Sequence, residues 1–372
     1  MQPDVEARLR FTTGGVAQSR SSGTPARYVS VLYRCRACST YVAGLTLSYV
    51  GCDRQHIPRV RLTTDLQEIP VDLDNRSHAP APVIRATAFV GRWPKIPWPD
   101  IPDATFPPTT ATLISGPTEA VLIDAMYLKA DVQDLGDLIE RTGKTLTTIY
   151  ITHAHADHYA GLGPLLERFP SARCVAMPHV VEAMREGMEL HNQQWEALFG
   201  DTYVIPGPLP EPMEGRTLFV DGSPVEIIEV KQADIHPTSI VHVPEAGVVV
   251  AGDSVYNEIY PMLGLSTPEE WSNWLETVAL VESLNPRMIV AGHRRPDGDD
   301  HAVQTMIAQT RAYIQDFAAA YEVAKNAEDL VAIMTAKYPH HGNLWSLQFS
   351  AGSVFQFRET GATASDDVPV TS

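Results

Sequence analysis

Hydrophobic residues along the middle of the chain fall into two patterns, which predict alternating strands and helices. Short runs rich in β-branched residues are typical of buried strands. They predict strands at 110–114, 120–123, 147–152, 225–230, 239–243, 248–251 and 288–291. Apolar residues spaced three and four apart predict a helix that ends at Gly143, a second over 268–284 and a third from Val303 to Phe317. Two β-rich halves with helices outside them imply a layered α/β sandwich.

The two ends of the chain lack these patterns. Ser, Thr, Arg and Pro interrupt the apolar pieces of residues 1–80, so we expect a poorly ordered or irregular extension there. Prolines crowd the stretch from Pro94 to Pro108, which must lie in loops or at sheet edges because proline cannot donate a ladder hydrogen bond. We therefore place one folded domain at 81–360, and the small polar residues of 361–372 predict a disordered tail.

Composition and charge narrow the possible partners. The chain has 372 residues, of which 44% are hydrophobic, enough to bury the core of a large domain. Its formal net charge of -17 repels nucleic acids and anionic membranes, so neither is expected as a partner. No run approaches the roughly 20 apolar residues of a membrane span. Asp4 and Glu6 argue against a secretory signal, and we expect a cytoplasmic protein.

Four cysteines offer little chemistry of their own. They are too few and too unevenly spaced to suggest a disulfide framework, and a reducing compartment is the simpler interpretation. Cys35 and Cys38, with Cys52 and His56, have donor atoms that suit a tetrahedral zinc ion. Their spacing is not that of a zinc finger and the segment has no framework, so we do not expect zinc here.

The strongest chemical signal is His153-x-His155-x-Asp157-His158, which follows the strand predicted at 147–152. Residues two apart on extended backbone point the same way, so His153 and His155 are placed to share one ion. The turn beyond them swings Asp157 and His158 toward a second ion. A polar loop that carries these residues by chance is the alternative, but four ligand-capable side chains within six residues favour a metal site.

This stretch resembles the signature of the metallo-β-lactamase superfamily, and the resemblance runs from about Thr110 to beyond His293. It implies an αββα four-layer sandwich and a binuclear metal centre with two Zn²⁺ per chain, Mn²⁺ or Fe²⁺ being the other candidates. The resemblance also implies two later ligands, each at the end of a strand. They are Asp253, which bridges the two ions in that family, and the final histidine, His293.

One position departs from the family pattern. A histidine normally follows the strand that corresponds to 225–230, and Gln232 stands there in this chain. Glutamine is a poor zinc ligand. His236, just before the next predicted strand, is the alternative that we favour, because a loop can reposition its side chain. If neither residue binds, the first ion keeps two histidines and a bridge, which leaves the identity and occupancy of the metal open.

The resemblance also suggests roles in catalysis. Two cations about 3.5 to 4 Å apart lower the pKa of a water molecule that attacks a carbonyl or phosphorus, and Asp157 would serve as ligand, general base and acid. Tyr256 follows Asp253 with the spacing of the family's lactone hydrolases, in which the tyrosine stabilises the charged oxygen. Packing in the core is the alternative for Tyr256, and Tyr260 is a second candidate of lower rank.

We therefore expect a metal-dependent hydrolase of a small molecule that opens an ester or amide, in the first place a lactone or lactam. Thioester hydrolysis of the glyoxalase II type and a non-catalytic metal-binding role, suggested by Gln232, are the alternatives. The acidic chain argues against nucleic-acid processing, and histidine at 155 argues against a diiron redox role. The apolar C-terminal helices could form a homodimer surface. We expect no catalytic role for the other histidines, His179, His191, His242, His301, His340 and His341. Four tryptophans, Trp93, Trp98, Trp195 and Trp345, fall in loop-like or ambiguous segments, where we expect packing in the core, with lining of an apolar substrate pocket as the alternative.

Overall fold

The computed structural model describes residues 29–33, 41–45, 83–98 and 101–360. The chain divides into two compact units, Met1–Arg76 and Ser77–Ser372. In the first unit the described residues form an antiparallel pair, β1 (Val29–Tyr33) and β2 (Tyr41–Leu45). The predictions for the rest of residues 1–80, for the cysteine cluster and for the tail at 361–372 lie outside the described residues.

The second unit contains a six-stranded sheet in the order β3-β4-β5-β6-β7-β8. Its strands are β3 (Arg85–Val90), β4 (Thr110–Ser115), β5 (Glu119–Ile123), β6 (Thr145–Ile151), β7 (Arg173–Ala176) and β8 (Glu211–Pro212). The first three pair antiparallel, and β5 to β8 pair parallel. Parallel strands need crossover connections. Helices α1 (Lys129–Thr142), α2 (Ala156–Tyr159), α3 (Leu162–Arg168) and α4 (Pro178–Phe199) lie in these connections.

A five-stranded sheet follows, in the order β13-β12-β11-β10-β9. Its strands are β9 (Thr217–Val220), β10 (Ser223–Val230), β11 (Thr238–Val243), β12 (Val248–Asn257) and β13 (Met288–Arg294). Only β12 and β13 pair parallel, across the crossover helix α5 (Pro268–Ser283). Three helices complete the described chain: α6 (Val303–Val323), α7 (Ala327–Lys337) and α8 (Leu344–Thr360).

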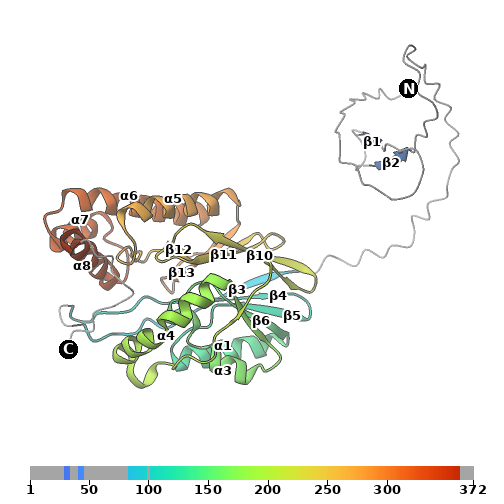
Figure 1. The fold of residues 1–372 in the computed structure, drawn as a ribbon, viewed down its shortest axis with the longest axis horizontal. Coiled ribbons are helices and arrows are strands. Elements are labelled where there is room, and N and C mark those ends of the chain that lie inside the picture. Colours follow the sequence, from blue (N-terminus) through green and yellow to red (C-terminus); the bar gives the residue numbers. More distant parts are fainter. Residues whose placement is uncertain (1–28, 34–40, 46–82, 99–100, 361–372) are drawn as a thin grey trace, which may run out of the picture. The chain divides into compact units, whose positions relative to one another are not determined.

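The two sheets pack face to face between layers of helices (Figure 1). Both edge strands of the five-stranded sheet contact the six-stranded sheet, β13 at β4 and β9 at β5. Helices α1, α3 and α4 cover the six-stranded sheet, and α5 and α6 cover the five-stranded sheet, where both contact β12. This arrangement confirms the αββα four-layer sandwich.

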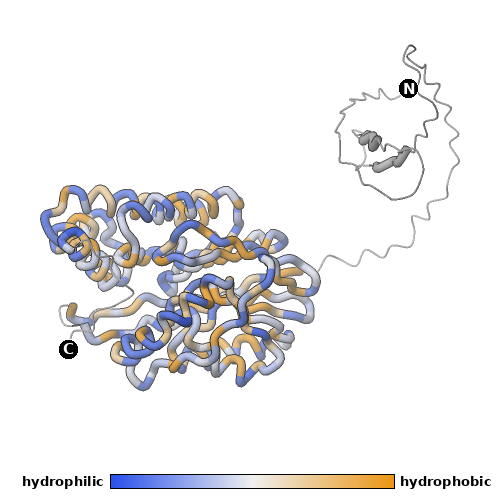
Figure 2. Tube along the Cα trace, viewed as in Figure 1, coloured by the Kyte–Doolittle hydropathy of each residue, from blue (hydrophilic) through white to orange (hydrophobic). Residues whose placement is uncertain are grey.

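Hydrophobic strands hold these layers together. Every residue of β12 is buried, as are five of the six residues of β4. One core cluster lies between the sheets and under α1 and α4, and a second joins the five-stranded sheet to α5, α6 and α8. Figure 2 shows the same pattern, with hydrophobic colouring along the strands and alternating colours on the outer helices. In the described part of the chain, no helix is both long and apolar enough to cross a membrane.

The predicted strands and helices are all present, most of them with small shifts at their ends. Strand β12 and helix α6 each continue six residues beyond their predicted ends, so Asp253 lies within β12 and not at its end as we expected. Gly143 ends α1 with φ +66°, the left-handed conformation that favours glycine. The sequence patterns missed β3, β7, β9, α4, α7 and α8. Trp195 and Trp345, which we had placed in loop-like or ambiguous segments, lie in α4 and α8.

Candidate metal centre

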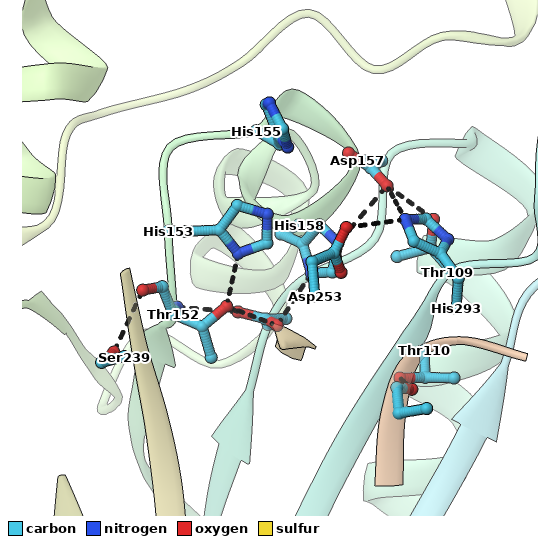
Figure 3. Close-up of polar contacts among 12 residues, drawn as sticks. Thr109, Thr110, Thr152, His153, His155, Asp157, His158, Ser239, Asp253 and His293 are labelled. Atoms are coloured by element: carbon cyan, nitrogen blue, oxygen red, sulfur yellow. Dashed lines mark hydrogen bonds and ion pairs between the residues drawn. The ribbon is translucent and has the colours of Figure 1, made fainter. Parts of the chain in front are cut away.

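The predicted ligands gather at the ends of β6 and β13 and beside the middle of β12 (Figure 3). His153 and His155 follow β6, and Asp157 and His158 belong to the short helix α2 directly after them. Asp253 lies within β12 and His293 within the neighbouring β13. Gly292 makes room for this arrangement, since a Cβ atom at that position would lie 2.0 Å from Oδ1 of Asp253. The fold thus brings together residues that are 140 positions apart in the sequence.

The possible ligand atoms form two groups, in each of which they lie within 4.8 Å of one another. The first ligand group contains His153, His155, Asp234 and Asp253. The second ligand group contains Asp157, His158 and His293. Of these residues only His155 is partly exposed, with 15% of its side-chain surface accessible.

Asp253 joins the two groups. Its Oδ1 lies 3.2 Å from Nε2 of His158, and its Oδ2 lies 3.1 Å from Nε2 of His293. Asp157 also faces both histidines of the second group, because its Oδ2 lies 3.4 Å from each Nε2. Asp253 belongs to the first group and faces the histidines of the second, so it has the position of a bridging ligand.

Hydrogen bonds from outside the two groups orient the histidines. Nδ1 of His158 lies 2.9 Å from Oδ2 of Asp124, and Nδ1 of His293 lies 3.3 Å from the carbonyl oxygen of Pro108. A ring nitrogen that donates its proton to such an acceptor leaves the lone pair of Nε2 free for a cation. The hydroxyl of Thr152 contacts Nδ1 of His153 at 2.9 Å in the same way.

Four buried atoms of the site lack a hydrogen-bond partner of acceptable geometry. They are Nε2 of His153, Nε2 of His158, Oδ2 of Asp234 and Oδ1 of Asp253. Three of these atoms lie 2.9–3.2 Å from an oppositely charged partner within the site, and Nε2 of His153 is the fourth. A buried polar atom without a partner costs about 1–3 kcal/mol, so the cluster needs an explanation. Cations would satisfy all four, since each atom belongs to a residue type that binds divalent metals. The residues present therefore fit a pair of metal ions.

The first ligand group contains Asp234, and it contains neither His236 nor Gln232, the two residues that we considered. Asp234 is 1% exposed and its Oδ2 lies 2.9 Å from Nδ1 of His155. His236, which we favoured, is exposed and outside both groups, so that prediction is corrected. Gln232 is buried, and its backbone N–H donates to the hydroxyl of Thr277. The signal we missed was a carboxylate in the loop between β10 and β11, because we searched that loop for a histidine.

The electrostatics of the site suit cations. Burial acts to raise the pKa of Asp253, but the neighbouring His293 and His158 hold it well below its usual range. Burial acts to lower the pKa of His158, and the charges of Asp157, Asp253 and Asp124 raise it well above its usual value. Asp253 is thus charged, which stabilises a positive charge beside it, whereas burial raises the pKa of Asp234 to about 6.

Tyr256 contacts the bridging carboxylate. Its hydroxyl donates to Oδ2 of Asp253 at 3.0 Å, and its ring stacks on that of His293 with centroids 5.7 Å apart. Burial and the charge of Asp253 raise the pKa of this phenol well above its usual value, so it stays protonated and remains a donor. The hydroxyl of Tyr260 donates instead to the carbonyl of Tyr338 at 2.8 Å.

A cavity with about 570 Å³ of empty space, part of it open to solvent, lies beside both ligand groups. His155, Asp157, Asp234, Asp253 and His293 form its polar side. The rest of its wall consists of Phe106, Pro107, His191, Gln194, Trp195, Tyr256, Met262, Leu265, Trp345, Ser346 and Phe349. The core packing expected for Trp195 and Trp345 is therefore only part of their role, because both also line this cavity, which was the alternative.

Comparison with known proteins agrees with this geometry. A model of the metallo-beta-lactamase superfamily matches residues 104–293, just over half of the chain, and the chain therefore belongs to that superfamily of hydrolases. A hydroxyacylglutathione hydrolase from Synechococcus sp. (strain WH7803) is 24% identical over 253 residues, which cover 65% of this chain and 86% of the relative.

Solved structures are similar in fold. A metallo-beta-lactamase family protein from Thermus thermophilus superposes with a TM-score of 0.50 and 18% identity, over 74% of this chain and 94% of that one. A beta-lactamase domain protein from Burkholderia ambifaria is also 18% identical, with a TM-score of 0.48 over 73% of this chain and 86% of that one. The first of these likenesses supports the fold described above and says nothing of the substrate.

Proposed function

We propose that this protein hydrolyses an ester or amide of a small molecule, in the first place a cyclic one, at two divalent cations held by the two ligand groups. The observation that carries the proposal is the position of Asp253, whose two carboxylate oxygens face the second ligand group while the residue also belongs to the first. The adjoining cavity gives a small molecule access to the same residues.

The first ligand group, with Asp234 as its third residue, would hold one cation, and the second group would hold the other. Divalent cations supply Lewis acidity at such a site, which polarises a carbonyl and lowers the pKa of a coordinated water. Zn²⁺ suits the histidines, and the three carboxylates also suit Mn²⁺ or Fe²⁺.

Asp157 is the residue to which we assign proton transfer. It lines the cavity, and its Oδ2 accepts a hydrogen bond of 2.8 Å from the hydroxyl of Thr109. This bond fixes the orientation of the carboxylate beside His158 and His293. Asp157 would accept the proton of the attacking water and then donate it to the leaving group.

Tyr256 has a different role in our proposal from the one we expected. Its single phenol proton is engaged with Asp253, so it cannot donate to a substrate oxygen at the same time. We assign to it the positioning of Asp253 between the two ligand groups.

Reconstitution tests the proposed function. Protein stripped by a chelator and reloaded with Zn²⁺ or Mn²⁺ should contain about two equivalents of metal and hydrolyse a chromogenic lactone or lactam, and chelator should abolish the turnover. Folded protein that holds two ions and hydrolyses none of a series of lactones, lactams and thioesters would contradict hydrolysis.

Thioester hydrolysis is the second candidate, and the relationship to a hydroxyacylglutathione hydrolase favours it. Turnover of a hydroxyacylglutathione that exceeds that of every lactone and lactam would make it the first. The third alternative, a non-catalytic metal-binding protein, was suggested by Gln232 alone. Asp234 supplies a carboxylate to the first ligand group, so Gln232 is a weaker argument for a non-catalytic protein.

A further inference from the structure

The apolar wall of the cavity is built around the ring of Phe106. Trp195 contacts this ring edge to face with centroids 5.1 Å apart, and Trp345 contacts it at 5.4 Å. Phe106 also meets the ring of His293 edge to face at 6.0 Å. The aromatic wall therefore begins directly beside a candidate metal ligand, so an apolar group of a molecule bound at the centre would face this wall.

Two helices that are distant in sequence supply the rest of this wall. Trp195 lies in α4, and Trp345 and Phe349 lie in α8 with their ring centroids 5.6 Å apart. Met262 and Leu265 add aliphatic surface from the chain between β12 and α5. A planar ring fits such a wall because edge-to-face contacts with aromatic side chains add about 0.5–1.5 kcal/mol to the burial of its area.

The charges of the cavity disfavour an anionic substrate. Among the described residues that line it there is no Lys or Arg, and its charged side chains other than histidines are Asp157, Asp234 and Asp253. Three carboxylates and two divalent cations leave one excess positive charge, whereas a histidine in place of Asp234 would leave two. One excess positive charge beside an apolar wall does not offset the free-energy cost of desolvating an anionic group on the substrate.

We propose that the substrate is an uncharged ester, lactone or amide with an aromatic ring next to its carbonyl, and that this ring binds against Phe106, Trp195 and Trp345. The proposal rests on the proposed function, since it assigns the substrate class of the same site. An uncharged aromatic substrate would distinguish this protein from enzymes that act on glutathione conjugates. A glutathione conjugate carries two carboxylates, which need cationic partners on the enzyme.

Binding of matched ketones to the zinc-loaded protein tests the proposal, because a ketone presents the carbonyl and cannot be hydrolysed. Acetophenone has the ring and no charge, 4-acetylbenzoate adds a carboxylate at the far end of the ring, and cyclohexyl methyl ketone replaces the aromatic ring. We expect 4-acetylbenzoate to bind at least tenfold more weakly than acetophenone by calorimetry or by the fluorescence of Trp195 and Trp345. Cyclohexyl methyl ketone should bind about twofold to tenfold more weakly.

A pair of variants locates the binding site. Trp345→Leu should weaken acetophenone binding at least fivefold while the metal content remains at about two equivalents. Phe219→Leu is the matched control, because Phe219 is 58% exposed on β9 and does not line the cavity, and it should leave binding within twofold. If Trp345→Leu does not fold, the comparison of the three ketones with the unaltered protein remains decisive.

Two outcomes would overturn the proposal: 4-acetylbenzoate binding as tightly as acetophenone, or acetophenone binding that Trp345→Leu leaves unchanged in folded protein. Neither outcome touches the proposed function, which is tested by metal-dependent turnover. Conversely, selective binding of acetophenone by a protein that hydrolyses no ester or amide would support the aromatic site and contradict hydrolysis.

Discussion

The two ligand groups of the metal centre differ in how the fold supports them. All three residues of the second group are buried, and each is held by a partner outside the group: Thr109 for Asp157, Asp124 for His158 and the Pro108 carbonyl for His293. In the first group Asp234 comes from the loop between β10 and β11, and His155 is partly exposed. Both of these residues line the cavity.

This difference implies that the two groups bind their cations with different affinity. A rigid and enclosed ligand set holds its cation tightly, because the ligands lose little freedom on binding. A set with a loop-borne carboxylate and a solvent-accessible histidine exchanges its cation more readily. We therefore expect the second group to hold the tighter ion and the first group to determine metal preference and access by substrate.

Loss of the carboxylate of Asp253 should have the largest effect on metal binding, because this carboxylate belongs to the first group and faces the histidines of the second. Asp253→Asn replaces one carboxylate oxygen by an amide nitrogen and removes the negative charge that both contacts share, so we expect both ions to bind more than about 100-fold more weakly and hydrolysis to fall to background. Metal analysis after dialysis measures this. Asp201→Asn, at an exposed position, is the control, and one tight ion retained by Asp253→Asn would show that the carboxylate does not bridge.

Replacement of the proposed proton carrier should affect turnover more than metal content. Asp157→Asn keeps an oxygen toward His158 and His293 but cannot accept a proton, so turnover should fall roughly 10²- to 10⁴-fold. Asp157→Ala should likewise leave the fold intact and remove turnover. Circular dichroism, metal analysis and kcat are the measurements, and unaltered turnover of either variant would show that the role is misassigned.

A change behind His158 should weaken the second group alone. Asp124→Asn places an amide where a carboxylate oxygen now accepts from Nδ1 of His158, which disfavours the tautomer that presents a lone pair on Nε2. We expect a loss of about 10- to 100-fold in affinity for one ion. Calorimetric titration with Zn²⁺ distinguishes the two ions. Equal weakening of both would mean that the groups are not independent.

Chelation should remove the ions in two steps and have the smallest effect. The ion of the first group should leave first, because His155 and Asp234 face the cavity. Full removal should lower the melting temperature by roughly 5–10 °C, since a ligand at 100 times its Kd contributes about 2.7 kcal/mol. Calorimetric scans during stepwise addition of chelator test this, and loss of both ions in one step would contradict the difference between the groups.

The same contrast explains how far the sequence could predict the site. Asp157 and His158 follow from a local motif, because they are adjacent and directly follow a predicted strand, whereas His293 was implied only by the resemblance to the family. Asp234 lies in a loop without periodicity, and only the folded chain brings it within 2.9 Å of His155. A search of that loop for every metal-ligating side chain, and not for histidine alone, would have included it.

The fold was predictable for a related reason. Strands such as β4 and β12 are buried throughout, so their apolar runs are unambiguous. The buried face of α4 includes His191 and Gln194, which interrupt its apolar period because they line the cavity. The sequence offered Trp195 and Trp345 only as an alternative lining of an apolar pocket, because they are 150 positions apart and meet only through tertiary packing against Phe106.

The central claim is that Asp234 completes a two-cation site, and a metal count of three proteins tests it most directly. Wild type and His236→Ala should each retain about two equivalents of Zn²⁺ after dialysis, because the side chain of His236 is exposed and outside both groups. Asp234→Ala should retain one. Loss of an ion from His236→Ala together with two ions in Asp234→Ala would contradict the account.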